Sequence, residues 1–250
     1  MNDLPFVLTV AGFDGSAGAG ILADVKAFCD FGVYGQAVCT ALTVQNESSF
    51  VSPGFLAWDN IQKQLETLYQ KRSFRWVKIG LIENAAVLKK IVEWLREKTP
   101  DVFIVWDPIV KASAGFQFFS ENEIDSLLSV LNRINLVTPN WFEFNYLGLG
   151  AADSQEKIVL GKSVSVLLKG GHAEGAEATD ILWHAGKRYK FTSKRLPGNG
   201  KHGSGCTLSA AILANLALGK TLPEACAEAK KYIEKFLSGG NGNLGGVFER

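Results

Sequence analysis

The sequence lacks the closely spaced cysteines and histidines that metal-binding domains use. It holds no Cys-x-x-Cys pair, and its cysteines and histidines are scattered: Cys29, Cys39, Cys206, Cys226, His172, His184 and His202. Structural zinc sites take their ligands from short, regularly spaced motifs. We therefore expect no zinc site, and cysteines without a disulfide pattern favour the reducing environment of the cytoplasm.

The sequence also lacks a long apolar segment and an excess of charge of either sign. No apolar run approaches the ~20 residues that a membrane-spanning helix needs, and residues 1–5 carry no basic segment typical of a secretory signal. The 26 Lys and Arg residues are balanced by 25 Asp and Glu residues. Because a net charge of +1 creates no field that would hold a polyanion, we expect neither nucleic acid nor a membrane as a partner.

The chain alternates between short β-branched runs and amphipathic segments. The expected strands are 6–11, 38–44, 76–79, 102–106, 136–137 and 165–168, and the expected helices are 19–31, 58–70, 85–98, 121–131, 207–218 and 222–237. Parallel strands need a crossover between them, usually a helix. The 250 residues, 47% of them hydrophobic, therefore predict an α/β fold with one domain over residues 1–250, a mostly parallel sheet and helices on both faces.

Local signals mark where several of the predicted helices begin and end. Gly32 and Gly219 stand where a residue in the left-handed conformation would end a helix. Two pairs have the spacing of a capping box, in which each side chain accepts a backbone N–H at the helix start: Ser120 with Glu123, and Thr221 with Glu224. These signals support the division into separate helices.

Residues 11–20 form a run of small residues between an expected strand and an expected helix, Ala-Gly-Phe-Asp-Gly-Ser-Ala-Gly-Ala-Gly. Glycines at such a junction allow unusual backbone angles and expose N–H groups at a helix start, where anionic groups bind. The run is not a P-loop, because no Gly-Lys-Ser/Thr follows, and it lacks the G-x-G-x-x-G order of dinucleotide-binding folds. A tight turn without a ligand is the alternative.

Residues 202–207, His-Gly-Ser-Gly-Cys-Thr, directly precede an apolar helix. A row of backbone N–H groups at a helix N-terminus stabilises negative charge, and the same dipole lowers the pKa of a thiol. Cys206 is therefore expected to act as a thiolate. One alternative is that Cys206 packs as a small buried apolar residue. Another is a cysteine hydrolase, which would need a histidine such as His202 as its base.

Polar side chains follow three more of the expected strands. Asp107 and Lys169 stand at strand ends, and Asn140 and Glu143 lie three residues apart at the start of a helix. Carboxylate and amide oxygens suit Mg²⁺, and a lysine pairs with phosphate oxygens. The alternatives are that Asn140 is a plain helix N-cap and that Asp107 and Lys169 are turn or surface residues.

Taken in this order, the segments resemble the hydroxymethylpyrimidine/phosphomethylpyrimidine kinase family of thiamine biosynthesis, and the likeness spans nearly the whole chain. The family's Ala-Gly-x-Asp-x-x-x-Gly-Ala-Gly is matched by residues 11–20, and the runs at 40–46 and 78–81 are close to its pattern. Its Asn-x-x-Glu is matched by residues 140–143 and its Gly-Thr-Gly-Cys anion hole by residues 203–206. Many sugar kinases of the superfamily carry Asp in place of this cysteine, so the thiol points to the pyrimidine and pyridoxal kinase branch.

The resemblance implies a ribokinase-like fold, MgATP as phosphate donor, a small pyrimidine substrate and a homodimer. The implied substrate residues are Gly12, Asp14, Ala19, Gly20, Val44, Gln45 and Leu81. The residues implied to serve the nucleotide phosphates are Asp107, Asn140 and Lys169, with Asp107 and Glu143 serving Mg²⁺. The implied catalytic group is Gly203, Ser204, Gly205 and Cys206, in which Cys206 takes the proton from the substrate's hydroxymethyl group.

The sequence departs from the family pattern at positions that bear on the substrate. Phe13 stands where the family usually has a small hydroxyl residue, residues 200–201 replace Asn-Thr, and the tail lacks the family's usual histidines. The resemblance therefore supports phosphorylation of hydroxymethylpyrimidine more strongly than that of its monophosphate. A pyridoxal kinase with the same cysteine motif is the alternative, and a small-molecule-binding protein without catalysis is a more distant one.

Overall fold

The computed structural model describes residues 4–111, 115–149, 164–171, 176–196 and 200–247. They form one nine-stranded sheet in the order β3-β2-β1-β4-β5-β6-β7-β8-β9. Six strands run parallel: β1 (Phe6–Asp14), β2 (Tyr34–Gln45), β4 (Trp76–Ile79), β5 (Phe103–Trp106), β6 (Leu136–Val137) and β7 (Ser165–Leu168). Three run antiparallel to their neighbours: β3 (Phe50–Phe55), β8 (Glu177–His184) and β9 (Lys187–Lys194). The predicted α/β fold with a mostly parallel sheet is confirmed.

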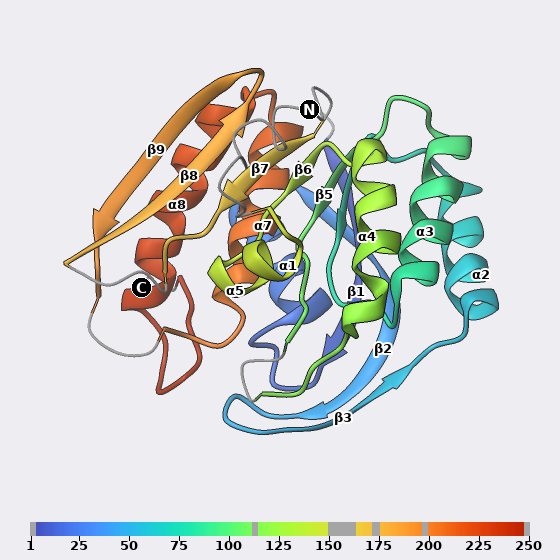
Figure 1. The fold of residues 1–250 in the computed structure, drawn as a ribbon, viewed down its shortest axis with the longest axis horizontal. Coiled ribbons are helices and arrows are strands. Elements are labelled where there is room, and N and C mark those ends of the chain that lie inside the picture. Colours follow the sequence, from blue (N-terminus) through green and yellow to red (C-terminus); the bar gives the residue numbers. More distant parts are fainter. Residues whose placement is uncertain (1–3, 112–114, 150–163, 172–175, 197–199, 248–250) are drawn as a thin grey trace.

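Helices cover both faces of this sheet (Figure 1). One face carries α1 (Gly20–Asp30), α7 (Ser204–Ala217) and α8 (Leu222–Ser238). The other carries α2 (Trp58–Tyr69), α3 (Ala85–Lys98), α4 (Ile124–Val130) and the short α5 (Trp141–Tyr146). Each face buries its own apolar cluster against the sheet, so the fold has two cores on either side of one sheet.

Several predicted elements appear with the expected bounds, and a few differ for local reasons. The expected helix at 121–131 is divided into the 3₁₀ turn Glu121–Glu123, α4 and a second 3₁₀ turn, Leu131–Arg133. The strand β3 was not expected, because its six residues include Pro53 and Gly54, which are uncommon in strands.

The predicted helix ends are confirmed. Both capping boxes form, one opening the 3₁₀ turn before α4 and the other opening α8. Gly32 and Gly219 follow α1 and α7 with φ angles of 69° and 88°, in the left-handed region that favours glycine.

The alternation of side chains along the strands carries polar groups to one edge of the sheet. Val105, Leu136 and Leu167, on β5, β6 and β7, belong to the apolar cluster beneath α7. Successive side chains of a strand point to opposite faces, so the residue two positions later points to the same face. Those later residues are Asp107, Thr138 and Lys169, at the carboxyl ends of the three strands and towards α7.

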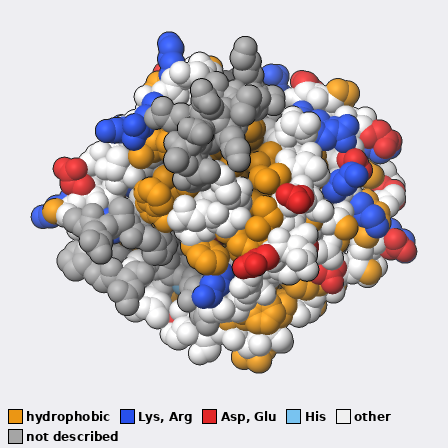
Figure 2. All heavy atoms as spheres, in the orientation of Figure 1, with side chains coloured by type: hydrophobic (Ala, Val, Ile, Leu, Met, Phe, Trp, Pro, Cys, Tyr) orange, Lys and Arg blue, Asp and Glu red, His pale blue; other side chains and the backbone are white. Residues whose placement is uncertain are grey.

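Strands β2 and β3 form a curved ribbon that extends from the body of the molecule (Figure 1). Three apolar side chains on it are largely exposed: Leu42 (56%), Val44 (58%) and Val51 (69%). Over the face in Figure 2, acidic and basic side chains are interspersed, as the net charge of +1 leads one to expect. In the described parts of the chain, no helix combines the length and the apolar character needed to cross a bilayer.

Candidate active site

A cavity of about 910 Å³ opens at the carboxyl edge of the sheet. It lies between the loop after β1, the β2–β3 turn, the ends of β5 to β7, the first turn of α7 and the tail after α8. Most of the site residues predicted from the sequence line this cavity: Gly12, Asp14, Ala19, Gly20, Gln45, Leu81, Asp107, Asn140, Glu143, Lys169, Gly203, Ser204, Gly205 and Cys206. The fold therefore brings widely separated motifs of the sequence to one place.

Val44 is the predicted substrate residue that does not line this cavity. Its neighbours Thr43 and Gln45 do line it. Because side chains alternate along a strand, Val44 points to the opposite side of β2, where its side chain is 58% exposed. The expectation that Val44 forms part of the pocket wall does not match this arrangement.

The loop after β1 is built around the buried carboxylate of Asp14. This carboxylate accepts hydrogen bonds from the backbone N–H groups of Ser16 and Ala19, both at 2.9 Å, and from Nε2 of His202 at 2.8 Å. Burial raises the pKa of Asp14, but the bonds from His202, Ser16 and Ala19 together hold it below its usual value. Asp14 thus fixes the shape of the small-residue loop and ties that loop to the segment before α7.

Two glycines allow these loops to meet backbone against backbone. Gly20 and Gly203 have φ angles of 62° and 73°. A Cβ atom on Gly203 would lie 1.9 Å from the carbonyl oxygen of Gly18, and one on Gly20 would lie 2.2 Å from that of Gly12. No other residue fits at either position, which explains why the sequence places glycine there.

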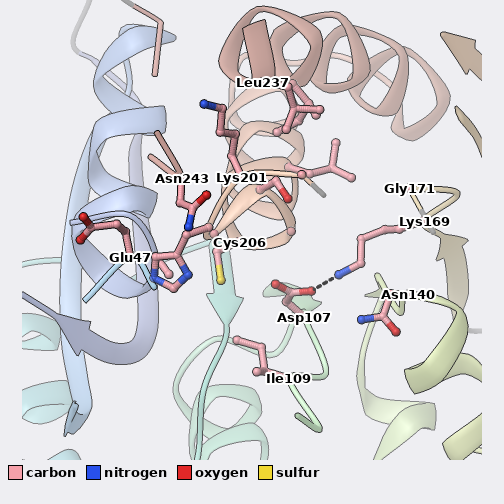
Figure 3. A pocket seen from close by; sticks show the side chains of 18 of the residues that line it. Glu47, Asp107, Ile109, Asn140, Lys169, Gly171, Lys201, Cys206, Leu237 and Asn243 are labelled. Carbon is pink, nitrogen blue, oxygen red and sulfur yellow. Dashed lines mark hydrogen bonds and ion pairs between the residues drawn. The ribbon is translucent and has the colours of Figure 1, made fainter. Parts of the chain in front are cut away.

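The first turn of α7 points its backbone N–H groups at the cavity. The helix begins at Ser204 after Gly203, which has no side chain to cap it, and the N–H of Ser204 donates to the carbonyl of Lys201 at 3.2 Å. Uncapped N–H groups at a helix start bind anions, and the helix dipole adds to this attraction. Cys206 lies in this turn, and Figure 3 shows its sulfur facing the same space as the Asp107 carboxylate.

The environment of Cys206 disfavours ionisation of its thiol. Burial raises the pKa of its thiol to about 12; Lys78 opposes this effect, and the charge of Asp107 adds to it. The residue is only 7% exposed, so the loss of hydration outweighs the helix dipole. In the protein without ligands, burial therefore favours the neutral thiol, and the role of Cys206 as a thiolate during the reaction stays a prediction.

Across the cavity, Asp107 and Lys169 form an ion pair. The Nζ of Lys169 lies 2.7 Å from Oδ1 of Asp107 (Figure 3), and Thr138 donates to the same oxygen at 3.2 Å. Burial raises the pKa of Asp107, but the charges of Lys169 and Lys78 outweigh it and lower the pKa below its usual range. Asp107 is 1% exposed, so it is a buried charge at a strand end and not a surface or turn residue.

Glu143 is the second carboxylate near Lys169. Its Oε2 lies 3.7 Å from Nζ of Lys169 and accepts the backbone N–H of Asn140 at 2.7 Å. Burial raises the pKa of Glu143 to about 7; Lys169 lowers it, and Asp107 raises it further. Glu143 therefore changes protonation state near neutral pH.

Asn140 is the N-cap of α5. Its Oδ1 accepts the backbone N–H of Glu143 at 2.9 Å, which completes a capping box. Asn140 is thus a helix cap, and the cap places Asn140 and Glu143 on the cavity wall; its role toward the nucleotide stays a prediction.

The amide of Gln45 reaches the cavity from the end of β2. Its Nε2 donates to Oγ1 of Thr43 at 2.8 Å, and Thr43 in turn donates to the carbonyl of Phe13 at 2.8 Å. These bonds orient the Gln45 side chain beside the loop after β1. Gly12 allows Leu81 to close this end, since a Cβ on Gly12 would lie 3.0 Å from Cδ2 of Leu81.

The tail after α8 completes the wall next to His202. The backbone N–H of His202 donates to the carbonyl of Asn243 at 2.8 Å, and Nζ of Lys201 donates to the carbonyl of Gly242. The side chain of Asn243 donates to Oγ of Ser48, in the β2–β3 turn, at 3.3 Å. The tail thus joins the segment before α7 to the β2–β3 ribbon.

The cysteine-hydrolase alternative would need a histidine bonded to Cys206. His202 is bonded to Asp14 instead, and in the described structure no hydrogen bond joins His202 to the sulfur. Nor do the described residues bring together three or more histidine, cysteine or acidic side chains as metal ligands. The geometry does not favour a thiol nucleophile with a histidine base.

Several residues that shape the site were not singled out from the sequence. Thr138 and Ser209 both donate to Asp107, and Asp24 and Lys78 form a fully buried pair near Cys206. The signal for the last two was present, because a lysine inside the apolar strand Trp76–Ile79 demands a buried partner. The partner itself could not be identified before the fold was known.

The comparison with protein-family models identifies the family of this chain. Residues 14–247 match the model described as phosphomethylpyrimidine kinase. The chain belongs to this family. It is accordingly a phosphotransferase of the hydroxymethylpyrimidine/phosphomethylpyrimidine kinase type.

Curated relatives of this kinase support the same assignment. The hydroxymethylpyrimidine/phosphomethylpyrimidine kinase of Aquifex aeolicus is 36% identical over 238 residues, which cover 92% of this chain and 93% of the relative. The kinase of the same name from Escherichia coli is 32% identical over 240 residues, covering 92% and 90%.

Solved structures share the fold of this kinase. The phosphomethylpyrimidine kinase of Clostridium difficile superposes with a TM-score of 0.77 at 32% identity, covering 92% of this chain and 98% of that one. The pyridoxal kinase of Staphylococcus aureus in complex with AMP-PCP gives a TM-score of 0.84 at 30% identity, covering 96% and 90%. The predicted ribokinase-like fold is thereby confirmed.

Proposed function

We propose that this kinase transfers the γ-phosphoryl group of ATP to the hydroxymethyl group of hydroxymethylpyrimidine, and then phosphorylates the resulting monophosphate. One observation carries the proposal: in a member of this family, the uncapped N-terminus of α7 with Cys206 and the Asp107–Lys169 pair face one cavity. One side offers backbone N–H donors and a thiol, and the other offers a buried ammonium group. This is the arrangement that phosphoryl transfer needs, since its catalysis is mostly positioning and charge stabilisation.

The pyrimidine ring is proposed to bind between the loop after β1 and Leu81. Gly12, Ala19 and Gly20 let a flat ring approach the backbone, and the Gln45 amide stands at the side of this space. A ring nitrogen next to an amino group presents one acceptor and one donor, which an amide complements. Asp14 serves this site through the loop that it holds.

The nucleotide phosphates are proposed to lie between α7 and the ends of β5 and β7. The N–H groups of Gly203, Gly205 and Cys206 would hold the transferring phosphoryl group, and Lys169 would neutralise charge on the phosphates. ATP is supported as the donor because structural neighbours are pyridoxal kinases in complex with AMP-PCP and ADP. An incoming phosphate would draw Lys169 away from part of its pairing with Asp107 and Glu143.

Cys206 is proposed to accept the proton of the substrate's hydroxymethyl group. Its sulfur interacts with the backbone N–H of Gly20, a contact that favours the thiolate, and positive charge brought beside it by the ligands would favour the thiolate further. A thiol with a pKa of about 12 gives a thiolate that is a strong proton acceptor. Since the transition state of phosphoryl transfer is loose, the proton needs to leave only late in the reaction.

The oxygen atoms of Asp107 and Glu143 fit Mg²⁺, which prefers carboxylate, phosphate and water ligands. Both carboxylates are engaged by Lys169, so we expect them to contact a hydrated ion that the phosphates also hold. Mg²⁺ would supply charge neutralisation on the transferring phosphates. Asn140 contributes by fixing the position of Glu143.

The working form of the enzyme is proposed to be a cytoplasmic homodimer. The exposed apolar side chains of Leu42, Val44 and Val51 on the β2–β3 ribbon support a contact between two copies. Light scattering of the purified protein tests this part, and a mass of one chain at micromolar concentration would refute it.

The test of the function is phosphate transfer from ATP to a panel of hydroxymethyl heterocycles. Hydroxymethylpyrimidine and its monophosphate should be phosphorylated with a higher kcat/KM than pyridoxal. Faster turnover of pyridoxal would reassign the substrate within the same fold. No turnover of any member, with MgATP bound, would instead indicate a binding protein without catalysis.

A further inference from the structure

A buried ion pair lies behind the first turn of α7, outside the cavity. The ammonium group of Lys78 on β4 is bonded to Asp24 on α1, and both side chains are fully buried. The other carboxylate oxygen of Asp24 accepts the hydroxyl of Thr9 at 2.6 Å. A buried ion pair is a poor device for stability, because the cost of removing both charges from water offsets their attraction. Its presence in a core therefore calls for another explanation.

The fold places this pair directly beneath the proposed anion hole. Thr9 and Lys78 are partners in the register of β1 and β4, and Lys78 is paired with Val105, two residues before Asp107. All three side chains point to the face that α1 and α7 cover, and α7 packs against both β1 and β4.

The pair acts on the site without touching a ligand. Neither Lys78 nor Asp24 lines the cavity. The charge of Lys78 nevertheless opposes the effect of burial on the thiol of Cys206 and lowers the pKa of Asp107. Lys78 itself stays protonated, because Asp24, Cys206 and Asp107 outweigh the effect of its burial and raise its pKa.

Other charged groups face Cys206 from the elements around it. Asp107 on β5 and Asp24 on α1 disfavour a thiolate. Lys169 after β7 interacts with the sulfur, and Glu143 on α5 interacts with Lys169. Among these groups Lys78 is held by Asp24 in a fully buried site outside the cavity, so substrates cannot displace it as they can displace Lys169.

We propose that Lys78, held by Asp24 and Thr9, is a positioning residue whose fixed positive charge beneath α7 supports the negative charge that develops on Cys206 during phosphoryl transfer. This inference rests on the proposed role of Cys206. It assigns a function to the Lys-Ile-Gly run at residues 78–80, which otherwise only forms a strand and its end.

A double-mutant cycle tests whether Lys78 acts through Cys206. The variant Lys78→Met/Asp24→Leu replaces both charged side chains by apolar ones of similar size. Both are changed because Lys78→Met alone would leave the carboxylate of Asp24 buried without a partner. Its kcat should fall at least about tenfold, with the KM for the pyrimidine unchanged because the pair lies outside the cavity. In a Cys206→Ala background the same change should alter kcat by no more than about twofold, because the group through which Lys78 acts is then absent.

A second measurement does not depend on turnover. Alkylation of Cys206 by iodoacetamide at pH 9, followed by peptide mass spectrometry in the ligand-free protein, reports the thiolate population. The Lys78→Met/Asp24→Leu variant should react more slowly than the wild type, by about fivefold or more. The control is Lys231→Met/Glu228→Gln, which removes an ion pair on α8 whose two residues do not line the cavity, and its Cys206 should react at the wild-type rate.

The two measurements separate this inference from the proposed function. If the wild-type protein phosphorylates none of the heterocycles, the proposed function fails, and the alkylation rates alone decide the role of Lys78. In an active enzyme, equal losses of kcat in the wild-type and Cys206→Ala backgrounds would show that the pair does not act through Cys206, and would overturn the inference. Unchanged alkylation of Cys206 would overturn the inference in either case.

Discussion

Replacing Cys206 gives the sharpest test of the proposed chemistry. Cys206→Ala removes one buried sulfur atom from the first turn of α7 and leaves the N–H groups of that turn in place. The fold and nucleotide binding should therefore persist. The kcat should fall by ~10²–10⁴-fold, the range for loss of a general base, which corresponds to about 3–5 kcal/mol of activation free energy.

The pH dependence follows from the pKa of about 12 for the Cys206 thiol. At pH 7 a thiol with such a pKa is ionised to roughly one part in 10⁵, and each unit of pH increases the thiolate about tenfold. Since the deprotonated form is the active one, log kcat/KM of the wild type should rise with a slope near one between pH 6 and about pH 9. The kcat reports the complex with ligands, so it should level off at lower pH.

Cys206→Asp is the informative partner of this experiment. A carboxylate is already ionised over that range, so the variant should recover activity relative to Cys206→Ala and lose the slope above pH 6. A remaining inflection near pH 7 in Cys206→Asp would report Glu143. The reasoning is refuted by wild-type rates in Cys206→Ala, by a flat wild-type profile of kcat/KM, or by a phosphoryl-thiol intermediate on Cys206 in intact mass spectra.

Three further substitutions test other parts of the site. Gln45→Leu should mainly raise the KM for the pyrimidine, by ~1–3 kcal/mol of binding, and an unchanged KM would reject its role. Glu143→Gln should raise the Mg²⁺ concentration for half-maximal rate. The pKa of Glu143 in the folded protein, about 7, lies above its usual value of 4.5, so this group stabilises the fold at low pH and the stabilisation is lost as the pH rises from about 4.5 to 7. In Glu143→Gln the free energy of unfolding should no longer fall over this range. Gly203→Ala should lower the free energy of unfolding, measured by urea titration, by more than ~2 kcal/mol, because the new Cβ would lie 1.9 Å from the Gly18 carbonyl oxygen. Gly186→Ala is the control for backbone strain alone, since Gly186 also has a positive φ of 72° but no atom lies within 4 Å of the position of its Cβ.

The sequence was sufficient to predict the parallel sheet because most of its elements carry strong local signals. The apolar strands, the amphipathic helices and the capping boxes depend on neighbours within a few residues. The strand β3 carries Pro53 and Gly54, and its pairing is set by β2 across a turn, so local preference does not identify it.

The sequence predicted most residues of the candidate site but not their protonation states or the ion pairs around them. Motifs after strands identified Asp107, Lys169 and Cys206, because the carboxyl ends of parallel strands share one edge. The protonation state of Cys206 could not follow from its position at a helix N-terminus, since the decisive factor is burial by the packed fold. The partner of Lys78 belongs to a helix 54 residues earlier, a distance that local reasoning does not bridge.

The tail after α8 has a practical consequence for handling the protein. Because His202 and Ser48 both bond to Asn243, the final glycine-rich stretch is part of the cavity wall. A protein cut back to the end of α8 would keep both cores yet lose a side of its binding pocket. Fusion partners and affinity tags therefore belong at the amino terminus, and a preparation clipped near Gly239 would look intact by circular dichroism while binding its substrate poorly.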